Sequence, residues 1–277
     1  MLRDITIGQY YQTESVIHSL DPRVKLMGTM VFIISLFIGR SVWMYLAVTL
    51  FLFGVIKLSK VPLQFIIKGL KAVLILVILS AAFNLFLTDG TVVLRLWKLT
   101  ITKEGIITAV FMVIRLLYLI MGSSLMTLTT TPNNLTDGLE KGLGFLKVIK
   151  VPVHEIAMMM SIALRFIPIL IEETDKIMKA QMARGADFEN GNILIRAKNT
   201  VPLLVPLFVS AFRRADDLAM AMEARCYNGG EGRTKMKPLK YEKDDRLAYI
   251  MLFVFLIIVI AFRVFLPFNI SSFIFAK

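Results

Sequence analysis

The sequence predicts an all-α integral membrane protein with about five transmembrane helices and long amphipathic helices that face the cytosol. Hydrophobic residues make up 57% of the 277 residues and charged residues only 19%. This hydrophobic share exceeds the roughly 45–50% that is typical of soluble domains, and the mean hydropathy is +0.72. Most of the charged residues lie in one segment after residue 131. The bilayer is therefore the expected solvent for most of the remaining chain.

Four apolar runs lie before residue 132, and a fifth lies near the C-terminus. A helix needs about 20 mostly apolar residues to cross the hydrocarbon layer. The first two runs are shorter, so we expect them to tilt or to form a tight hairpin around Gly39 and Arg40. The five runs are residues 26–39, 41–56, 72–88, 105–131 and 247–262. Between the third and fourth runs, residues 91–94 and 99–102 predict a small β-hairpin on the outer face.

The positions of the lysines and arginines predict the orientation. Arg23 and Lys25 precede the first run, and four lysines lie between residues 57 and 71. The positive-inside rule places these ends, and the N-terminus, in the cytoplasm. This arrangement explains much of the net charge of +12, because residues 1–130 carry 12 basic and 5 acidic side chains whereas residues 131–246 carry 18 and 15. Without a basic stripe and interleaved aromatic residues, we expect no nucleic-acid partner.

The segment 132–245 is predicted to be amphipathic and cytosolic. It separates an N-terminal transmembrane domain, residues 1–131, from a C-terminal transmembrane helix, residues 246–277. Apolar residues at steps of three or four predict one long helix over residues 152–185, kinked at Pro168. A second helix is predicted over residues 202–225, after a loop at 187–192, and it ends before Asn228-Gly229-Gly230.

Both predicted helices end in the same pattern. In each, an Asp is followed five residues later by Ala and nine residues later by Arg, within Ala183-Arg184-Gly185 and Ala224-Arg225-Cys226. An exposed Arg at a helix C-terminus can enter an acidic groove of a partner and form forked hydrogen bonds. Alternatively, each Arg only complements the helix dipole, for about 0.3–1 kcal/mol, and Gly185 only stops the helix. The repetition favours a pair of docking sites.

The paired pattern resembles the T component of energy-coupling factor (ECF) transporters, whose two coupling helices each end in a short Ala-Arg-Gly-like motif. Ser19-Leu-Asp-Pro-Arg-Val-Lys-Leu26 resembles the opening of that family, and Leu164-Arg-Phe-Ile-Pro168 resembles part of its first coupling helix. The resemblance covers nearly the whole chain. Cys226 departs from the commoner Gly at the third position of the second motif, but it is also small.

The resemblance implies a non-catalytic coupling subunit in the bacterial cell membrane. Its partners would be two ABC-type ATPases, which bind the ATP, and a small membrane-embedded S component that binds a vitamin or a metal ion. Residues 183–185 and 224–226 would each bind one ATPase. The implied chain has no cofactor, catalytic residue, substrate site or metal site of its own. Transport would follow when ATP-driven closure of the ATPases shifts the coupling helices and tips the S component.

Seven methionines lie on the two amphipathic helices: Met158, Met159, Met160, Met178, Met182, Met220 and Met222. Flexible thioethers suit a surface that accepts several interchangeable S components. Ordinary helix packing explains them equally well. Arg115 within the fourth apolar run is costly in lipid and is therefore a further functional candidate that faces another helix or a polar cavity.

Other features that could indicate an enzyme have simpler explanations. His154-Glu155 lacks the second His of a zinc-protease helix, since Met158 stands there, and no phosphate-binding Gly-x-x-x-x-Gly-Lys loop occurs. The carboxylate pairs Glu172-Glu173 and Asp216-Asp217 are interpreted as a solvated charged face, because basic side chains lie nearby: Lys176, Arg213 and Arg214. Two alternatives remain, a secondary transporter that carries its own substrate and a membrane scaffold. Inverted repeats around broken helices, typical of secondary carriers, are not found in the apolar runs.

Overall fold

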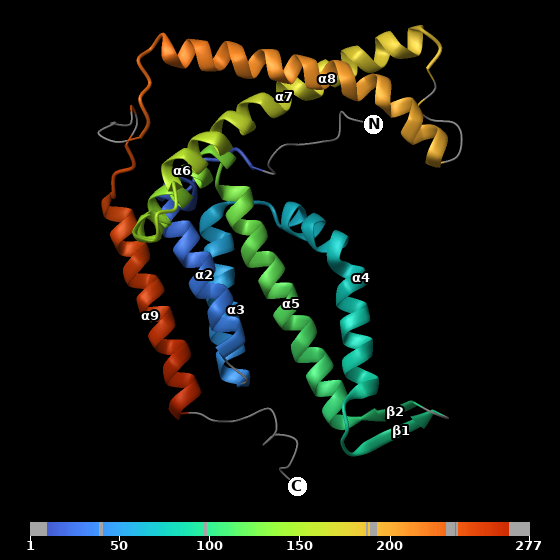
Figure 1. Ribbon diagram of the computed structural model, residues 1–277. Helices are drawn as coiled ribbons and strands as arrows, with labels where there is room; N and C mark the ends of the chain where they lie inside the picture. Colours follow the sequence, from blue (N-terminus) through green and yellow to red (C-terminus); the bar gives the residue numbers. More distant parts are fainter. Residues whose placement is uncertain are drawn as a thin grey trace. The chain divides into compact units, whose positions relative to one another are not determined.

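The computed structural model describes residues 10–38, 41–96, 99–186, 188, 193–230, 236 and 238–265, and these are mostly helical (Figure 1). The chain divides into two compact units. The bundle unit is the described part of Gly8–Gly138 and Leu239–Lys277. The crossed-helix unit is described from Leu139 to Pro238. Each unit has its own internal packing and is considered separately below.

Apolar helices form the bundle unit. The short helix α1 packs against α3, α2 contacts α5 and α9, α3 contacts α5 and α9, and α4 lies along α5 (Figure 1). Each apolar run of the sequence forms one of the long helices, with ends that differ from the predicted ends by a few residues, except that α4 begins nine residues earlier. The helices are α1 Val16–Ser19, α2 Pro22–Ile38, α3 Val42–Ser59, α4 Leu63–Leu87, α5 Lys103–Thr129 and α9 Lys243–Phe265.

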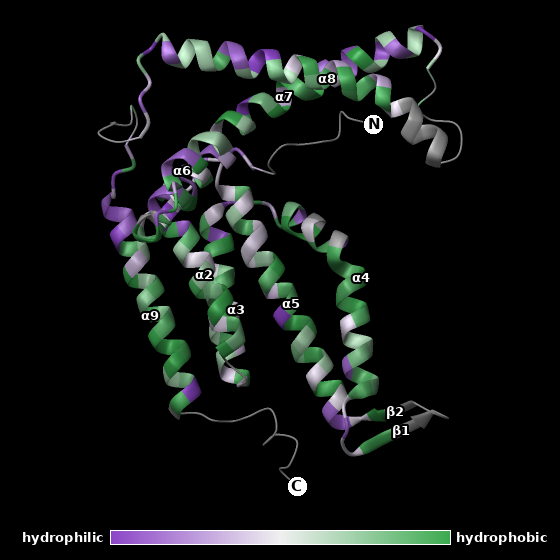
Figure 2. Cartoon of the chain, in the orientation of Figure 1, coloured by the Kyte–Doolittle hydropathy of each residue, from purple (hydrophilic) through white to green (hydrophobic). Residues whose placement is uncertain are grey.

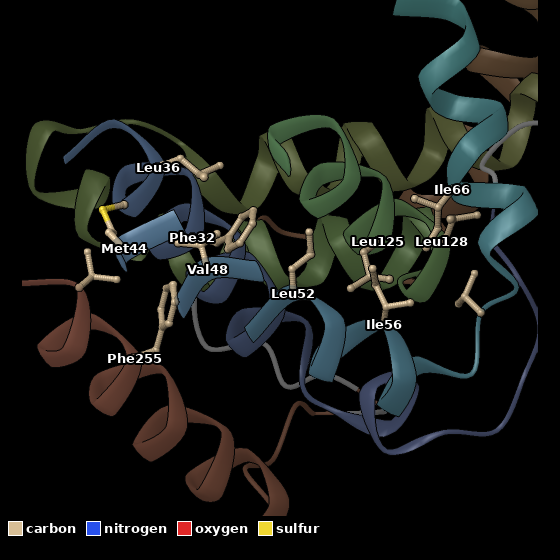
Figure 3. Packing of buried hydrophobic residues seen from close by; sticks show 12 residues of the cluster. Phe32, Leu36, Met44, Val48, Leu52, Ile56, Ile66, Leu125, Leu128 and Phe255 are labelled. Atoms are coloured by element: carbon tan, nitrogen blue, oxygen red, sulfur yellow. The ribbon is translucent and has the colours of Figure 1, made fainter. Parts of the chain in front are cut away.

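The core of the bundle unit lies where α2, α3, α5 and α9 meet (Figure 3). Met44, Val48, Leu52 and Ile56 follow one another at every fourth position of α3 and form one buried stripe. Phe51 of α3 stacks on Phe255 of α9 with 4.2 Å between the ring centroids. The core is completed by Phe32, Leu36, Val61, Ile66, Leu125, Leu128 and Val259.

A glycine allows α2 and α5 to approach each other. A Cβ atom added to Gly122 of α5 would lie 2.5 Å from the ring of Phe32. Small residues at such crossings are typical of helices in membranes, where close packing provides much of the association energy.

The outward faces of the bundle helices are strongly apolar (Figure 2). Ile75 and Leu87 of α4 and Phe53 of α3 are 79%, 72% and 65% exposed. In water such a surface would cause aggregation, whereas in a bilayer it faces lipid tails. The helical backbone satisfies its own hydrogen bonds, as a membrane requires.

Four described helices, α3, α5, α9 and α7 of the crossed-helix unit, are long and apolar enough to cross a membrane, or five if the two segments of α4 that meet at a 62° bend count as one span. The predicted fold class, an all-α membrane protein with about five spans, is confirmed. The candidate spans differ from the predicted ones in two helices. Helix α7, which was predicted to be amphipathic, has the length and composition of a span. Helix α2, which was predicted as the first span, is too short to count because it has only 17 residues.

The predicted β-hairpin is present. Strands β1 Val92–Leu96 and β2 Leu99–Thr102 pair in an antiparallel sheet, with a register shift between Val92 and Leu94. The Thr102 side chain accepts the Gly105 N–H at 3.0 Å and so caps the start of α5. The hairpin therefore leads directly into α5.

The crossed-helix unit consists mainly of two long helices, α7 Val153–Ala183 and α8 Ile193–Glu223. The sequence predicted α7 well, but α8 begins nine residues before the predicted start at Pro202, and Pro202 and Pro206 lie inside it. Proline has no N–H, so α8 continues past both positions without the two backbone bonds that these residues would otherwise donate. The predicted loop 187–192 lies almost entirely outside the described residues.

Two short helices precede α7 and were not predicted. They are α6 Pro132–Gly142 and the 3-10 helix η2 Gly144–Ile149. Their sequences contain several glycines and few apolar residues at helical spacing, so hydrophobic periodicity did not reveal them. The predicted division at residues 131 and 245 stays a prediction, because it concerns which segments lie in the cytosol.

Candidate functional site

Helices α7 and α8 cross in an antiparallel sense (Figure 1). At the crossing, Glu173 of α7 accepts hydrogen bonds from the Ser210 hydroxyl and the Arg214 guanidinium of α8, the latter at 2.9 Å between Oε2 and Nη2. Towards the end of α7, the Gln181 amide donates to the Pro202 carbonyl at 3.3 Å. Glu172, Asp216 and Asp217 are exposed, whereas Glu173 and Arg214 are only partly exposed and pair across the two helices.

The antiparallel crossing places the two predicted docking motifs at opposite ends of the helix pair (Figure 1). Arg184 lies about three helical turns beyond Glu173, and Arg225 lies about three turns beyond Arg214. At a rise of 1.5 Å per residue, each motif is about 16 Å along its helix from the crossing. The structure does not bring the motifs together, so they are two separate segments at opposite ends of the helix pair.

The first motif forms a complete Schellman cap at the end of α7. The Ala186 N–H donates to the Gln181 carbonyl at 3.0 Å, and the Gly185 N–H donates to the Met182 carbonyl at 2.9 Å. Gly185 has φ +90°, in the left-handed region that only glycine adopts readily. Arg184 is thus the C-cap residue of α7.

The second motif repeats this cap at the end of α8. The Tyr227 N–H donates to the Met222 carbonyl at 3.0 Å, and the Cys226 N–H donates to the Glu223 carbonyl at 2.8 Å. Cys226 has φ +53°, so it takes the left-handed conformation in spite of its side chain. Arg225 therefore occupies the same position in its cap as Arg184 does. The sequence identified both motifs, but only the structure shows that their backbones are equivalent.

Both guanidinium groups are available to a partner. All six motif residues, Ala183, Arg184, Gly185, Ala224, Arg225 and Cys226, are exposed. Within the part of the chain that the structure describes, neither Arg184 nor Arg225 has a hydrogen-bond or ion-pair partner in its own chain. Small neighbours on both sides leave each guanidinium unobstructed, and each could receive a carboxylate in forked geometry.

The family model of the cobalt transport proteins, CbiQ, matches residues 13–236 of the chain, which include both motifs and their helices. The chain belongs to this family. A relative from Clostridium kluyveri, the energy-coupling factor transporter transmembrane protein EcfT, is 54% identical over 266 residues, 95% of this chain and 98% of the relative. The protein of the same name from Ruminiclostridium cellulolyticum is 54% identical over 89% of this chain and 92% of its own length. The one from Bacillus subtilis is 47% identical over 92% of this chain and 96% of its own length.

Family membership and the apolar helices together establish the general role. The chain is the transmembrane component of an ECF transporter and a multi-pass protein of the cell membrane. The resemblance drawn from the sequence motifs is confirmed. Among the described residues, no group of three or more His, Cys, Asp and Glu side chains is arranged to hold a metal ion.

The N-terminal motif shared with the family forms a junction within the bundle unit. The Asp21 carboxylate accepts the Arg23 backbone N–H at 2.9 Å and the Arg23 guanidinium at 2.8 and 3.0 Å. The guanidinium carbon also lies 3.9 Å from the centroid of the Tyr241 ring, just before α9. The Lys25 ammonium donates to the carbonyls of His18 and Thr129, at 3.0 and 2.9 Å. The motif thus joins the starts of α2 and α9 to the end of α5.

Asp245 completes this junction and was not singled out in the sequence. Its carboxylate is buried and accepts the backbone N–H groups of Asp21 at 2.7 Å and Glu242 at 2.8 Å. The second bond caps the start of α9, as the acidic side chain of a capping box does. Burial raises the pKa of the neighbouring Asp21 carboxyl, but the hydrogen bonds and charge of Arg23 outweigh this and hold that pKa below its ordinary value.

The segment after the second motif returns to the start of α7. Gly229 has φ +82°, and a Cβ atom added to Gly230 would lie 2.2 Å from Cδ2 of His154. His154 Nδ1 and Glu140 Oε1 of α6 are 3.0 Å apart. His154 and Gly230 therefore have a packing role, which explains His154 without a metal and explains why glycine follows the motif.

Proposed function

We propose that α7 and α8 are the coupling helices of the transporter and that each motif end binds one ATPase subunit. The observation that carries this proposal is the repeated cap, in which an exposed Arg precedes a left-handed residue at the end of both helices. A dipole-complementing Arg would explain one such end. Two equivalent ends on one antiparallel pair fit two related partners better.

The crossing supplies a mechanism for coupling the two ends. Glu173 is bonded to two side chains of α8, so a force on one helix end is transmitted to the other helix. When the ATPases approach each other on binding ATP and separate after hydrolysis, the angle or position of the crossed helices changes. ATP is bound by the partners, and this chain supplies neither a nucleotide site nor a cofactor.

An exposed apolar face on α8 supports contact with a membrane-embedded partner. Val201, Val205, Phe208 and Phe212 are spaced three or four residues apart and are 52–68% exposed. An amphipathic helix that leaves such a stripe uncovered needs a partner or a lipid surface. We assign this face to the S component, which captures a vitamin or a metal ion and is tipped when the crossed helices move. The N-terminus and the crossed-helix unit lie in the cytoplasm in this proposal.

The test is ATP-dependent uptake by the co-purified complex in proteoliposomes. Arg184→Glu and Arg225→Glu should each weaken binding of the ATPases and reduce uptake, and the double variant should abolish uptake. Lys179→Glu on α7 and Arg213→Glu on α8 are matched controls, because they reverse exposed charges on the same helices outside the motifs. The controls should retain most of the wild-type uptake.

Three outcomes would contradict the proposal. If the double variant transports as well as the controls do, the motifs are only helix caps. If the isolated chain binds or transports substrate without ATPases, it is a secondary transporter, and if it recruits neither ATPases nor a substrate-binding protein, it is a scaffold.

A further inference from the structure

Arg115 is an ionisable residue in the middle of the apolar helix α5, and the structure shows what holds it. Its Nε–H donates to the hydroxyl oxygen of Tyr45 on α3 at 3.1 Å. Tyr45 is nearly fully buried, and its ring packs on Phe111 with 5.1 Å between centroids. One helical turn further along both helices, the hydroxyl groups of Thr49 and Tyr118 are 2.6 Å apart. A polar ladder thus joins α3 to α5 and fixes the orientation of the guanidinium.

This ladder provides an acceptor for only one of the guanidinium N–H groups. Tyr45 occupies Nε, and within the described residues the two Nη groups have no hydrogen-bond acceptor. Four N–H donors therefore remain on a permanent positive charge. In an apolar environment an unpaired guanidinium is strongly unfavourable, so an anion is expected to complete the site.

The surroundings indicate where the anion comes from. The guanidinium carbon lies 5.8 Å from the centroid of the Phe37 ring, and Phe37 is 61% exposed on the outer surface of the bundle unit. Trp43, at the start of α3, is 50% exposed. Phe37 lies in the last turn of α2 and Tyr45 in the first turn of α3, so the site is level with the ends of these two helices. An exposed Trp at the start of a membrane helix is typical of the lipid headgroup level.

The lengths of α2 and α3 also indicate that the anion comes from a lipid headgroup. With 17 and 18 residues, α2 and α3 are about 26–27 Å long, shorter than the roughly 30 Å of the hydrocarbon layer. Around such short helices, lipid headgroups lie closer to the helix ends, and flanking cations reach towards them. A lipid phosphate can then approach Arg115, although α5 itself continues for about three more turns towards Lys103.

We propose that Arg115 and Tyr45 form a binding site for the phosphate group of a membrane phospholipid. The two Nη groups donate to two phosphate oxygens in forked geometry, and the Tyr45 hydroxyl, whose oxygen accepts from Nε, directs its proton to the same phosphate. The acyl chains lie along the apolar faces of α2 and α3. This site is separate from the motifs of α7 and α8 and does not depend on their proposed function.

The test measures lipid binding to the full-length chain in detergent, by native mass spectrometry and by the shift of the thermal unfolding midpoint. The probes are phosphatidylglycerol, diacylglycerol with the same chains, and inorganic phosphate. Wild type should bind phosphatidylglycerol in preference to both other probes. Arg115→Gln should weaken this binding about tenfold or more, because charge-assisted forked bonds are lost. Arg115→Lys, which keeps the charge, should weaken it severalfold, and Tyr45→Phe should weaken it less.

Arg263→Gln is the matched control, since it removes an exposed cation from another apolar helix, α9. The proposal is overturned if Arg115→Gln and Arg263→Gln lose the same amount of binding, or if diacylglycerol binds as well as phosphatidylglycerol. Equal binding of inorganic phosphate would assign the site to an aqueous ion. If Arg115→Gln keeps the lipid but loses a membrane-embedded protein partner from the complex, the anion is a carboxylate of that partner.

Discussion

Gly185 and Cys226 occupy the same position in two equivalent helix caps, and both have positive φ, +90° and +53°. Each donates its N–H to a carbonyl three residues earlier, and the next residue bonds five residues back. In the sequence the motif is Ala-Arg followed by a small residue. In the structure this third residue is the one that takes the left-handed backbone conformation.

The caps predict opposite effects of two substitutions. Gly185→Ala should destabilise the end of α7 by about 1 kcal/mol, because alanine is strained at positive φ. Cys226→Gly should stabilise the end of α8 by about 0.5 kcal/mol, since relief of strain exceeds the gain in chain entropy. Amide hydrogen exchange of the last helical turn measures both. Equal effects of the two changes in either direction would contradict the assigned caps.

The crossing predicts a variant that assembles but transports poorly. Glu173→Ala removes the acceptor for Ser210 and Arg214, yet the pair is partly exposed and contributes less than about 1 kcal/mol to stability. We expect normal co-purification with the ATPases and normal ATP hydrolysis, with uptake reduced severalfold. Glu172→Ala, at the exposed neighbouring position, is the control. Full uptake by Glu173→Ala would show that the bonds at the crossing do not transmit motion.

The junction predicts that Asp245 is important for stability. Asp245→Ala leaves the buried N–H of Asp21 and the part-buried N–H of Glu242 without an acceptor and should cost about 2 kcal/mol. Asp244→Ala removes an exposed carboxylate one residue earlier and should have little effect. Thermal unfolding of the two variants in the same detergent separates them. Similar unfolding midpoints would mean that the buried bonds are replaced by water.

The lowered pKa of Asp21 predicts a pH dependence. Because its pKa is lower in the folded state, the contribution of this carboxylate is complete above its unfolded value of about 3.9 and is lost as the pH falls through the folded value. The difference in stability between wild type and Asp21→Asn should therefore be constant from pH 7 to 5 and shrink below about pH 4. A difference that stays constant down to pH 3 would exclude this contribution.

The methionines test whether S components are interchangeable. Met159, Met160, Met182 and Met220 are 42–60% exposed. If flexible thioethers adapt this surface to several S components, leucine at these four positions should weaken the binding of some S components more than others. Met44→Leu, in the core of the bundle unit, is the control. Equal weakening for every S component would indicate ordinary packing.

Much of this protein could be predicted from the sequence. The apolar runs determined the long helices of the bundle unit, because the cost of placing unpaired backbone and charge in lipid leaves few alternatives. The β-branched residues around 91–102 predicted the hairpin, and periodic apolar residues predicted α7. The repeated Ala-Arg-small pattern identified both motifs without any structure, because helix capping is a local property of a few consecutive residues.

Tertiary structure decided the features that depend on residues far apart in the sequence. The pairing of Glu173 with Arg214, the buried bond from Asp21 to Asp245 and the bond from Arg115 to Tyr45 join residues separated by 41, 224 and 70 positions. The sequence predicted that α8 starts at Pro202, but the helix starts at Ile193, and Pro202 and Pro206 lie inside it. Periodicity and capping are set by neighbours along the chain, whereas the partner of a buried polar group is set by how helices pack, and one sequence alone does not contain that information.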